Sequence, residues 1–185
     1  MIDLLRLEVP FSDEVARELE AGQRLLLTGV IFGARDQAHL RFATALQRGE
    51  SLPLDLKGQV LYYVGPTPAP PGRPCGAAGP TTAGRMDRYT PLLLEYGIKG
   101  VIGKGKRSPQ VVAALQKHGA VYLAATGGAG ALIGRCIEEM RVVAYPDLGP
   151  EAVYRMVVRN LPVTVAVDSR GRNLYEEEPA RYRLR

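Results

Sequence analysis

The sequence predicts an α/β protein that folds as one domain, and three observations lead to this prediction. Short apolar runs typical of buried strands alternate along the chain with segments whose apolar residues have helical spacing. Glycine (21 residues) and proline (14 residues) are frequent, whereas aromatic residues make up only 6% of the chain and Trp is absent. The 185 residues, 46% of them hydrophobic, suffice for one ordinary domain and are few for two. We therefore expect a single domain over residues 1–185, with its chemistry on tight loops.

The first third of the chain is predicted to form three strands and two helices. Apolar runs predict strands at 4–9, 25–30 and 60–64. Between them, helical spacing predicts one helix from Ser12 to near Gly22 and a second over 36–46. Each strand is followed by a helix or a loop, as in a run of βα units.

The middle of the chain continues this alternation. Helical spacing over 86–96 predicts a helix whose regular part begins near Pro91, and the next strand is expected at 98–102. Ser108 and Pro109 supply a cap and a first-turn proline for a helix that ends before Gly119. A further strand is expected at 120–125.

The last third is predicted to contain two more helices and two more strands. The pattern predicts a helix over 131–141, a strand at 142–145, a helix over 149–158 and a strand at 161–167. Residues 175–185 are rich in charge and are expected to form a solvated tail.

A loop between Gly65 and Gly84 contains six prolines. So many prolines are typical either of a disordered linker or of a functional loop with a fixed shape. The apolar segments on both sides favour the fixed loop.

The bulk composition narrows the range of partners. The net charge is +5, from 24 Lys and Arg against 19 Asp and Glu, with the basic residues spread along most of the chain. This modest excess favours an acidic small molecule or an acidic partner surface over nucleic acid, and the few aromatic residues disfavour base stacking. No amino-terminal leader and no apolar run of about 18 residues is evident, so we expect a cytoplasmic protein that does not bind membranes. Cys75 and Cys136 form no Cys-x-x-Cys pair and are expected to be reduced thiols.

Three loops carry the residue types that bind anions. The segment Gly79-Pro80-Thr81-Thr82-Ala83-Gly84-Arg85-Met86-Asp87 places two hydroxyls and a guanidinium just ahead of a helix. Arg35 follows a strand and lies beside a helix start, and Lys104 is placed between two glycines. Because the planar fork of Arg matches a carboxylate, Arg35 and Arg85 are the natural pair for the two ends of a dicarboxylate. Any one of these loops alone could equally be a solvated surface loop.

Other residues could support such a site. Asp36 can cap the helix that follows Arg35, and His39, one turn later, either orients a carboxylate or is a structural residue. Asp87 ends the nine-residue motif, and His118 is expected at a helix end without a chemical role. We expect Arg107→Lys to be nearly silent.

The glycines from Gly128 to Gly134 allow a different interpretation of the ligand, namely a dinucleotide. They follow a strand, open a helix and precede Asp147, which is close to a dinucleotide-binding fingerprint. The third glycine comes one place late, so helix packing or anion contact is favoured over nicotinamide binding.

Together, the motifs resemble one family: the β subunit of class I iron-sulfur-dependent fumarate hydratase and L(+)-tartrate dehydratase. The resemblance rests on the segments Ala34-Arg35-Asp36-x-Ala38-His39, Gly79 to Asp87, Gly103-Lys104-Gly105 and Gly127-Gly128-x-Gly130-Ala131-Leu132, and it covers essentially the whole chain. It implies a swivelling β/β/α domain with a mixed sheet and flanking helices. It also implies an α subunit that carries a four-iron four-sulfur cluster on three cysteines. The two cysteines of this chain cannot supply three cluster ligands, which agrees with that division.

The resemblance implies roles for individual residues. Arg35, Thr82, Arg85 and Lys104 would bind the substrate carboxylates, and Thr81 would lie at the carbon that exchanges a proton. The cluster iron would act as a Lewis acid on the substrate hydroxyl, and an α-subunit carboxylate would serve as the acid. Asp36, His39, Asp87 and Gly128 would support these groups, this chain would bind no metal itself, and Cys75 has no assigned role.

The implied activity is reversible hydration of fumarate to L-malate by a hetero-oligomer, a dimer of αβ pairs. L(+)-tartrate dehydration is the nearest alternative, and a non-catalytic module that binds a dicarboxylate or a partner protein is another.

Overall fold

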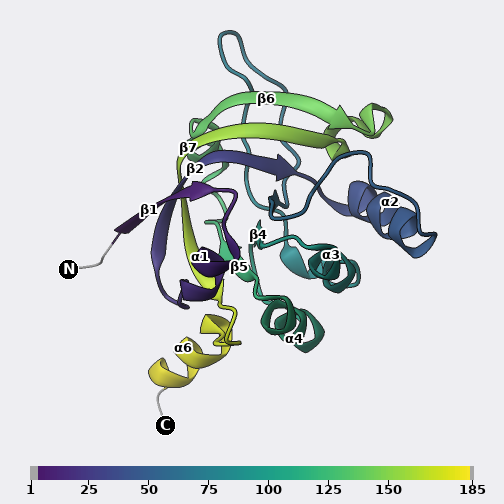
Figure 1. The fold of residues 1–185 in the computed structure, drawn as a ribbon. Helices are drawn as coiled ribbons and strands as arrows, with labels where there is room; N and C mark the ends of the chain where they lie inside the picture. Colours follow the sequence, from purple (N-terminus) through teal and green to yellow (C-terminus); the bar gives the residue numbers. More distant parts are fainter. Residues whose placement is uncertain (1–3, 184–185) are drawn as a thin grey trace.

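The computed structural model describes residues 4–183, which form a mixed α/β fold with a seven-stranded sheet and flanking helices (Figure 1). The strands are β1 (Leu4–Val9), β2 (Arg24–Gly33), β3 (Val60–Tyr62), β4 (Gly100–Gly103), β5 (Val121–Ala124), β6 (Ile137–Ala144) and β7 (Val153–Val167). The α-helices are α1 (Asp13–Glu18), α2 (Asp36–Gln47), α3 (Thr90–Tyr96), α4 (Pro109–His118), α5 (Gly130–Gly134) and α6 (Leu174–Tyr182). Two short 3-10 helices are η1 (Ala83–Met86) and η2 (Pro146–Glu151).

The sheet closes on itself through its longest strand, β7. Strands β1 to β5 are joined by parallel pairs, β1–β2, β2–β3, β3–β4 and β4–β5. β7 runs antiparallel to β5 and β6 and also pairs along nearly the whole length of β2. The pairings β2–β3–β4–β5–β7–β2 therefore form a ring, with β1 and β6 outside it.

Two hydrophobic cores lie on opposite faces of the parallel strands. Because side chains alternate along a strand, Tyr62 and Ile102 face the core enclosed by the ring, whereas Leu61 and Val101 face the helices. In Figure 1, α2, α3 and α4 lie on that helical side, and Phe42, Leu93 and Leu115 are among the residues that fill the second core.

Many of the predicted elements are confirmed. Ser12 and Ser108 cap α1 and α4, since each hydroxyl accepts the N–H of the residue three positions later. The regular helix near Pro91 begins at Thr90, as its proline requires. The strands at 4–9, 25–30, 60–64, 98–102 and 120–125 all lie on or overlap observed strands.

Two predicted helices were wrong. Residues 131–141 form the five-residue helix α5 and then the start of β6, and residues 149–158 form η2 and the start of β7. In both strands, irregular register produces spacings of three between inward-facing residues, which imitate a helix. β6 pairs with β7 across register shifts at 137/139 and 142/144, and Asn160 in β7 has a φ of 52°.

A smaller prediction was also wrong. Asp36 does not cap α2: Arg35 holds the cap position, and Asp36 is the first helical residue.

The segment expected to be a solvated tail forms α6 up to Tyr182, and none of the α6 residues is buried. The Tyr175 hydroxyl accepts the Gly105 N–H at 3.1 Å. Of that segment, residues 184–185 lie outside the described residues.

The proline-rich loop has a defined shape. It projects past β6 as a narrow excursion of the chain (Figure 1), and its base is closed by Thr67. The Thr67 N–H donates to the Ala77 carbonyl at 2.9 Å, and the Thr67 hydroxyl accepts the Ala77 N–H at 2.7 Å. These bonds agree with a loop of fixed shape rather than a disordered linker.

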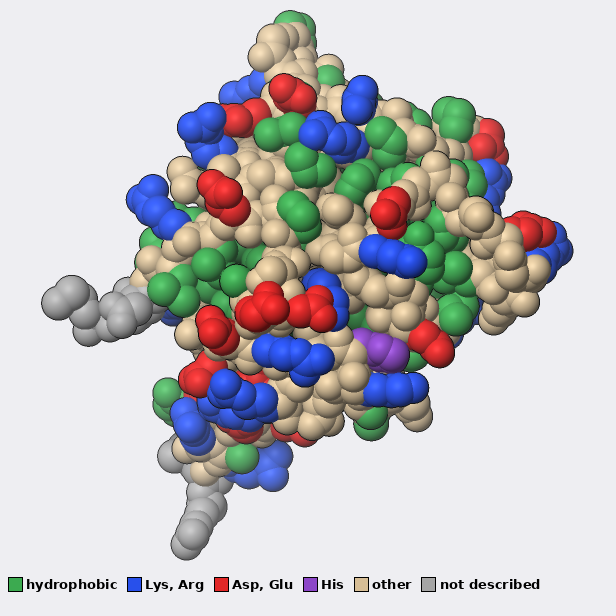
Figure 2. Space-filling model, in the orientation of Figure 1, with side chains coloured by type: hydrophobic (Ala, Val, Ile, Leu, Met, Phe, Trp, Pro, Cys, Tyr) green, Lys and Arg blue, Asp and Glu red, His purple; other side chains and the backbone are tan. Residues whose placement is uncertain are grey.

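The distribution of charge and the character of the helices bear on the kinds of partner that the chain could bind. Basic and acidic side chains are interspersed over the face shown in Figure 2. Within residues 4–183, no helix has the length and apolar character needed to cross a bilayer.

Candidate functional site

The predicted anion-binding loops meet at one edge of the sheet. β2, β3, β4 and β5 run parallel, so their carboxyl ends lie at the same edge. Arg35 follows β2, Gly65 follows β3, Lys104 follows β4 and Gly127 follows β5. The carboxyl ends of parallel strands are where α/β proteins ordinarily bind their ligands, in closed barrels as in open sheets.

Thr81 and Thr82 are held to this edge by backbone hydrogen bonds. The Thr81 N–H donates to the Tyr63 carbonyl at 2.7 Å, and the Lys104 N–H donates to the Thr81 carbonyl at 3.2 Å. The Ala83 N–H donates back to the Lys104 carbonyl at 2.8 Å. The double-threonine segment therefore lies directly beside the Lys104 backbone.

The guanidinium of Arg35 lies against the backbone of Gly65. A Cβ atom at Gly65 would come within 2.5 Å of Arg35 Cζ, so this position requires glycine while Arg35 keeps its place. Arg35 Nε lies 3.7 Å from Glu151 Oε1, and the Arg35 side chain is 26% exposed.

Arg85 belongs to η1 and pairs with the first residue of α2. Its Nε donates to Asp36 Oδ1 at 3.0 Å, and its Nη2 lies 2.7 Å from Asp36 Oδ2. The Arg85 side chain is 52% exposed, so the guanidinium remains accessible to a ligand.

Lys104 approaches the glycine loop after β5. A Cβ at Gly127 would lie 3.3 Å from Lys104 Cδ and 3.8 Å from its Nζ. Within residues 4–183, no carboxylate lies within ion-pair distance of Lys104. The neighbouring Gly128 has a φ of 80° and open space around it.

Asp87, which is partly buried, and the buried Arg107 form an ion pair behind this edge. Arg107 Nε donates to Asp87 Oδ1 at 2.7 Å, and the Ser108 N–H donates to Asp87 Oδ2 at 2.6 Å. The Arg107 side chain is fully buried. A nearly silent Arg107→Lys substitution would suit an exposed cation, whereas Arg107 is buried and paired.

His39 is fully buried in α2. Its Nδ1 lies 3.0 Å from the Arg35 carbonyl, and its ring packs edge-on against Tyr63 with centroids 5.0 Å apart. Burial lowers the pKa of His39 to about 4, so the ring is neutral near pH 7 and its Nδ1–H donates to Arg35. This contact supports the backbone of Arg35. His118 ends α4, as expected.

The sequence did not predict four residues that contact the loops of the candidate site: Gly65 and Glu151 beside Arg35, and Tyr122 and Tyr175 beside Gly105. Glu151 was assigned to a helix, and its approach to Arg35 depends on the path of η2. The hydroxyls of Tyr122 and Tyr175 bind the carbonyl and the N–H of Gly105, respectively, at 2.9 and 3.1 Å. No local sequence signal marks these contacts, because each joins distant segments.

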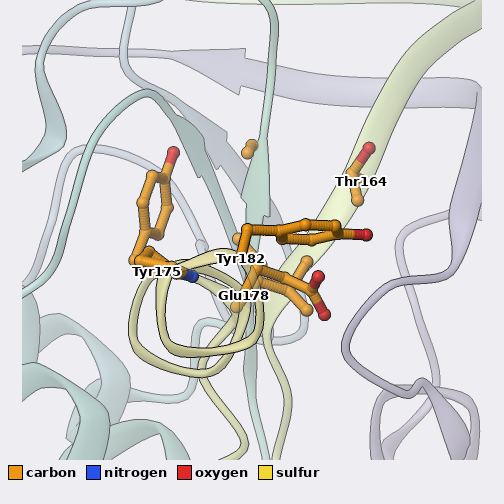
Figure 3. A pocket seen from close by; sticks show the side chains of 8 residues that line it. Thr164, Tyr175, Glu178 and Tyr182 are labelled. Carbon is orange, nitrogen blue, oxygen red and sulfur yellow. The ribbon is translucent and has the colours of Figure 1, made fainter. Parts of the chain in front are cut away.

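A groove of 390 Å³ lies between α6 and strands β5 and β7 (Figure 3). One of its lining residues, Tyr175, contacts the Lys104 loop through Gly105. In Figure 3, Tyr182 and Glu178 extend from α6 toward the side of Thr164, while Tyr175 stands apart on the other side of the helix. The lining of this groove is largely apolar and contains none of the predicted site residues, so the groove is distinct from the candidate anion site.

The thiols do not fit a metal cluster. Cys75 is buried and Cys136 half-buried, both are free, and burial raises the pKa of each thiol. The described residues contain no cluster of three or more His, Cys, Asp or Glu able to hold a metal ion.

The structure does not support the dinucleotide alternative. The helix after Gly128 has only five residues, and the strand that follows it, β6, pairs antiparallel with β7 rather than parallel with β5. Asp147 lies in η2 and binds Arg41. A dinucleotide fold requires a parallel βαβ unit at this point.

The fold and the site together define an α/β domain with a cationic edge suited to small anions. Comparison with known proteins makes the class specific: the family described as Fumarase C-terminus matches residues 2–178, and the chain belongs to this family.

Several relatives carry names that describe an activity. The chain is 41% identical over 156 residues to "Fumarate hydratase class I, anaerobic" of Escherichia coli (strain K12), covering 83% of this chain and 28% of that protein. It is 38% identical over 170 residues to "Fumarate hydratase 2" of Leishmania major, covering 89% of this chain and 30% of that protein. The chain thus spans under a third of these fumarate hydratases.

A third relative is similar over most of its own length. "Putative L(+)-tartrate dehydratase subunit beta" of Methanocaldococcus jannaschii is 36% identical over 167 residues, which is 87% of this chain and 86% of that protein.

Proposed function

We propose that this chain is the β subunit of a two-subunit hydro-lyase that interconverts fumarate and L-malate and is active only with an α subunit. The observation that supports it best is the gathering of Arg35, Thr81, Arg85 and Lys104 at one sheet edge, in a chain of the Fumarase C-terminus family. The names of the fumarate hydratase relatives supply the reaction.

The charges at the edge favour a site that a partner completes. Arg35 lies near Glu151 and Arg85 pairs with Asp36, which leaves Lys104 as the excess positive charge among the described site residues. A dicarboxylate carries two negative charges, so this edge alone balances only part of its ligand. Thr82 and Arg85 are also exposed, as expected for groups that face an absent subunit.

In this proposal, each side chain has a separate task. Arg35 and Arg85 bind the two carboxylates through paired N–H donors, and Lys104 adds a point charge, with the Thr82 hydroxyl donating to the same ligand. Thr81 Oγ1 lies at the carbon that exchanges a proton. Because a threonine hydroxyl is a poor base, the neighbouring cations must stabilise its charged form.

Four residues support these groups in the proposal. His39 and Asp87 contact the backbones of Arg35 and Ser108, and Asp36 aligns Arg85. Gly128 keeps the loop beside Lys104 open, since no atom lies within 4 Å of its Cβ position.

The four-iron four-sulfur cluster of the proposed enzyme belongs to the α subunit. The two thiols of this chain are buried or half-buried and supply no ligand set, so we derive no chemical step of this chain through the cluster. We further propose a dimer of αβ pairs, a single swivelling β/β/α domain over residues 1–185, and a cytoplasmic location. The ring of strands, which ties β2 to β7, supports the single domain, and the free thiols agree with a reducing compartment.

L(+)-tartrate dehydration is a second candidate, favoured by the match to a tartrate dehydratase β subunit over 86% of that protein. One experiment separates the two. The tagged chain is recovered anaerobically from its host, and the eluate is assayed for iron, sulfide, fumarate hydration and tartrate dehydration.

Iron-bearing eluate with fumarate turnover is the expected result. Preferred tartrate turnover would move the assignment to the second candidate. A colourless and inactive chain, recovered alone while a control cluster enzyme survives, would leave a non-catalytic binding module.

A further inference from the structure

The Arg107 side chain is the least exposed cation among the ion pairs of residues 4–183. Its Nε binds Asp87, its Nη2 donates to Thr90 Oγ1 at 2.8 Å, and its Cζ lies 5.3 and 5.0 Å from the ring centroids of Tyr63 and Tyr122. Each of these contacts comes from a different segment. Asp87 follows η1 and Thr90 begins α3, whereas Tyr63 directly follows β3 and Tyr122 lies in β5.

The Thr90 hydroxyl lies at the centre of this network, and all of its hydrogen-bonding positions are used. Its Oγ1 donates to the Met86 carbonyl at 2.9 Å and also lies within hydrogen-bond distance of Arg107 Nη2 and, at 3.0 Å, of the Tyr63 hydroxyl. Since a hydroxyl has one donor and two acceptor positions, Tyr63 must be the donor here. The one donor and two acceptor positions of the Thr90 hydroxyl are therefore all used, and one of them holds the Arg107 guanidinium at the start of α3.

A buried ion pair gives little stability beyond an apolar replacement, because desolvation of the two charges offsets their attraction. Its distinctive effect is geometric. Asp87 lies two residues after Arg85, and Arg107 lies three residues after Lys104. Asp87 also accepts the Ser108 N–H, so the pair joins the two anion-binding loops behind the sheet edge.

We propose that Arg107 is a positioning residue that holds the Thr81–Arg85 turn against the Lys104 loop, so that both address the same dicarboxylate. Arg107 itself contacts no ligand. This inference rests on the proposed function for its ligand, but its geometric part concerns this chain alone.

The test replaces the planar fork while keeping the charge. Arg107→Lys retains a cation but cannot bind Asp87 and Thr90 through two fixed N–H groups. In the complex with the α subunit, we expect KM for fumarate and for L-malate to rise by roughly tenfold, with a smaller change in kcat. Thr90→Val removes the three hydrogen bonds of this hydroxyl, that to Arg107 included, without changing a charge. It should shift KM in the same direction, which covers the case that Arg107→Lys does not fold.

Hydrogen exchange on the chain gives a readout that needs no activity. The amides of Ala83 and Lys104 bond across the two loops. In Arg107→Lys they should exchange faster by roughly tenfold or more, while the amides of β6, which lies outside the ring of strands, keep their rates. Arg88 is an exposed arginine next to Asp87, in the turn after η1. Arg88→Lys serves as the matched control and should change neither KM nor exchange.

The outcomes separate the two claims. Unchanged exchange at Ala83 and Lys104, an equal rise throughout the sheet, or faster exchange with unchanged KM would each overturn the positioning role. A wild-type complex without hydratase activity would overturn the proposed function instead, and the exchange measurement would still decide the positioning of the loops.

Discussion

Arg85 and Asp36, 49 residues apart in the chain, form a two-point ion pair across the candidate site, with N to O distances of 3.0 and 2.7 Å. The pair aligns the Arg85 guanidinium before any ligand arrives. A ligand carboxylate can then use the remaining N–H donors, so Asp36 orients Arg85 at the cost of part of its charge.

Arg85→Lys should raise KM for the dicarboxylate by roughly tenfold, because a single ammonium cannot bind Asp36 and a carboxylate in the same planar arrangement. Steady-state kinetics of the complex measure this change. Arg88→Lys in the same turn is the control, and equal effects of the two substitutions would refute the role of Arg85.

Gly65→Ala should displace the Arg35 guanidinium, since the new Cβ would come within 2.5 Å of its Cζ. We expect KM to rise while the free energy of unfolding changes little. Gly72→Ala provides the contrast: it lies in the same loop with a φ of 74° and open space, so it should cost about 1 kcal/mol of stability without affecting KM. Kinetics and urea unfolding of both variants distinguish the two effects.

His39 should make the protein less stable as the pH falls. Burial lowers the pKa of His39 from 6.5 to about 4, so below pH 6.5 the unfolded chain binds a proton that the folded chain does not. The resulting loss of unfolding free energy develops between pH 6.5 and 4 and amounts to about 3 kcal/mol in full. Urea unfolding at pH 7 and pH 4.5 should show a steeper decline for the wild type than for His39→Asn. Parallel declines would contradict the neutral buried histidine.

Tyr175→Phe should weaken the attachment of α6 to the Lys104 loop, because it removes the hydroxyl that accepts the Gly105 N–H. The expected loss is about 1 kcal/mol in the free energy of unfolding, measured by urea denaturation. Tyr182, 80% exposed on the same helix, is the control, and Tyr182→Phe should leave stability unchanged. A neutral Tyr175→Phe would show that α6 is held by its other contacts.

Local signals were sufficient for much of the fold. Caps, a first-turn proline and glycine stops define α4 completely, and the parallel strands are short apolar runs between such signals. The loops that carry Arg35, Thr81 and Lys104 were found from their residue types, hydroxyls and cations among glycines. The parallel order of β2, β3 and β4 and the backbone bonds of Thr81 to Tyr63 and Lys104 bring them to one edge.

The remaining features depend on contacts that no short window contains. The inward-facing residues Ile137, Met140 and Ala144 have helical spacing, yet they lie on an edge strand whose register shifts create that spacing. Arg107→Lys was expected to be nearly silent because the partners of Arg107 lie far from it in the sequence: Asp87 follows η1, and Thr90 begins α3. Whether a cation is buried depends on the tertiary structure.

The ring closure by β7 has a consequence for synthesis of the chain. Arg24 pairs with Thr164 and Gly33 with Tyr154, so one edge of β2 stays uncovered until nearly the whole sheet has been made. At ribosomal rates of about 5–20 residues per second, that interval lasts on the order of ten seconds. During this time an open strand edge can pair with other nascent chains, which makes the newborn protein a natural client for chaperones that shield exposed strands.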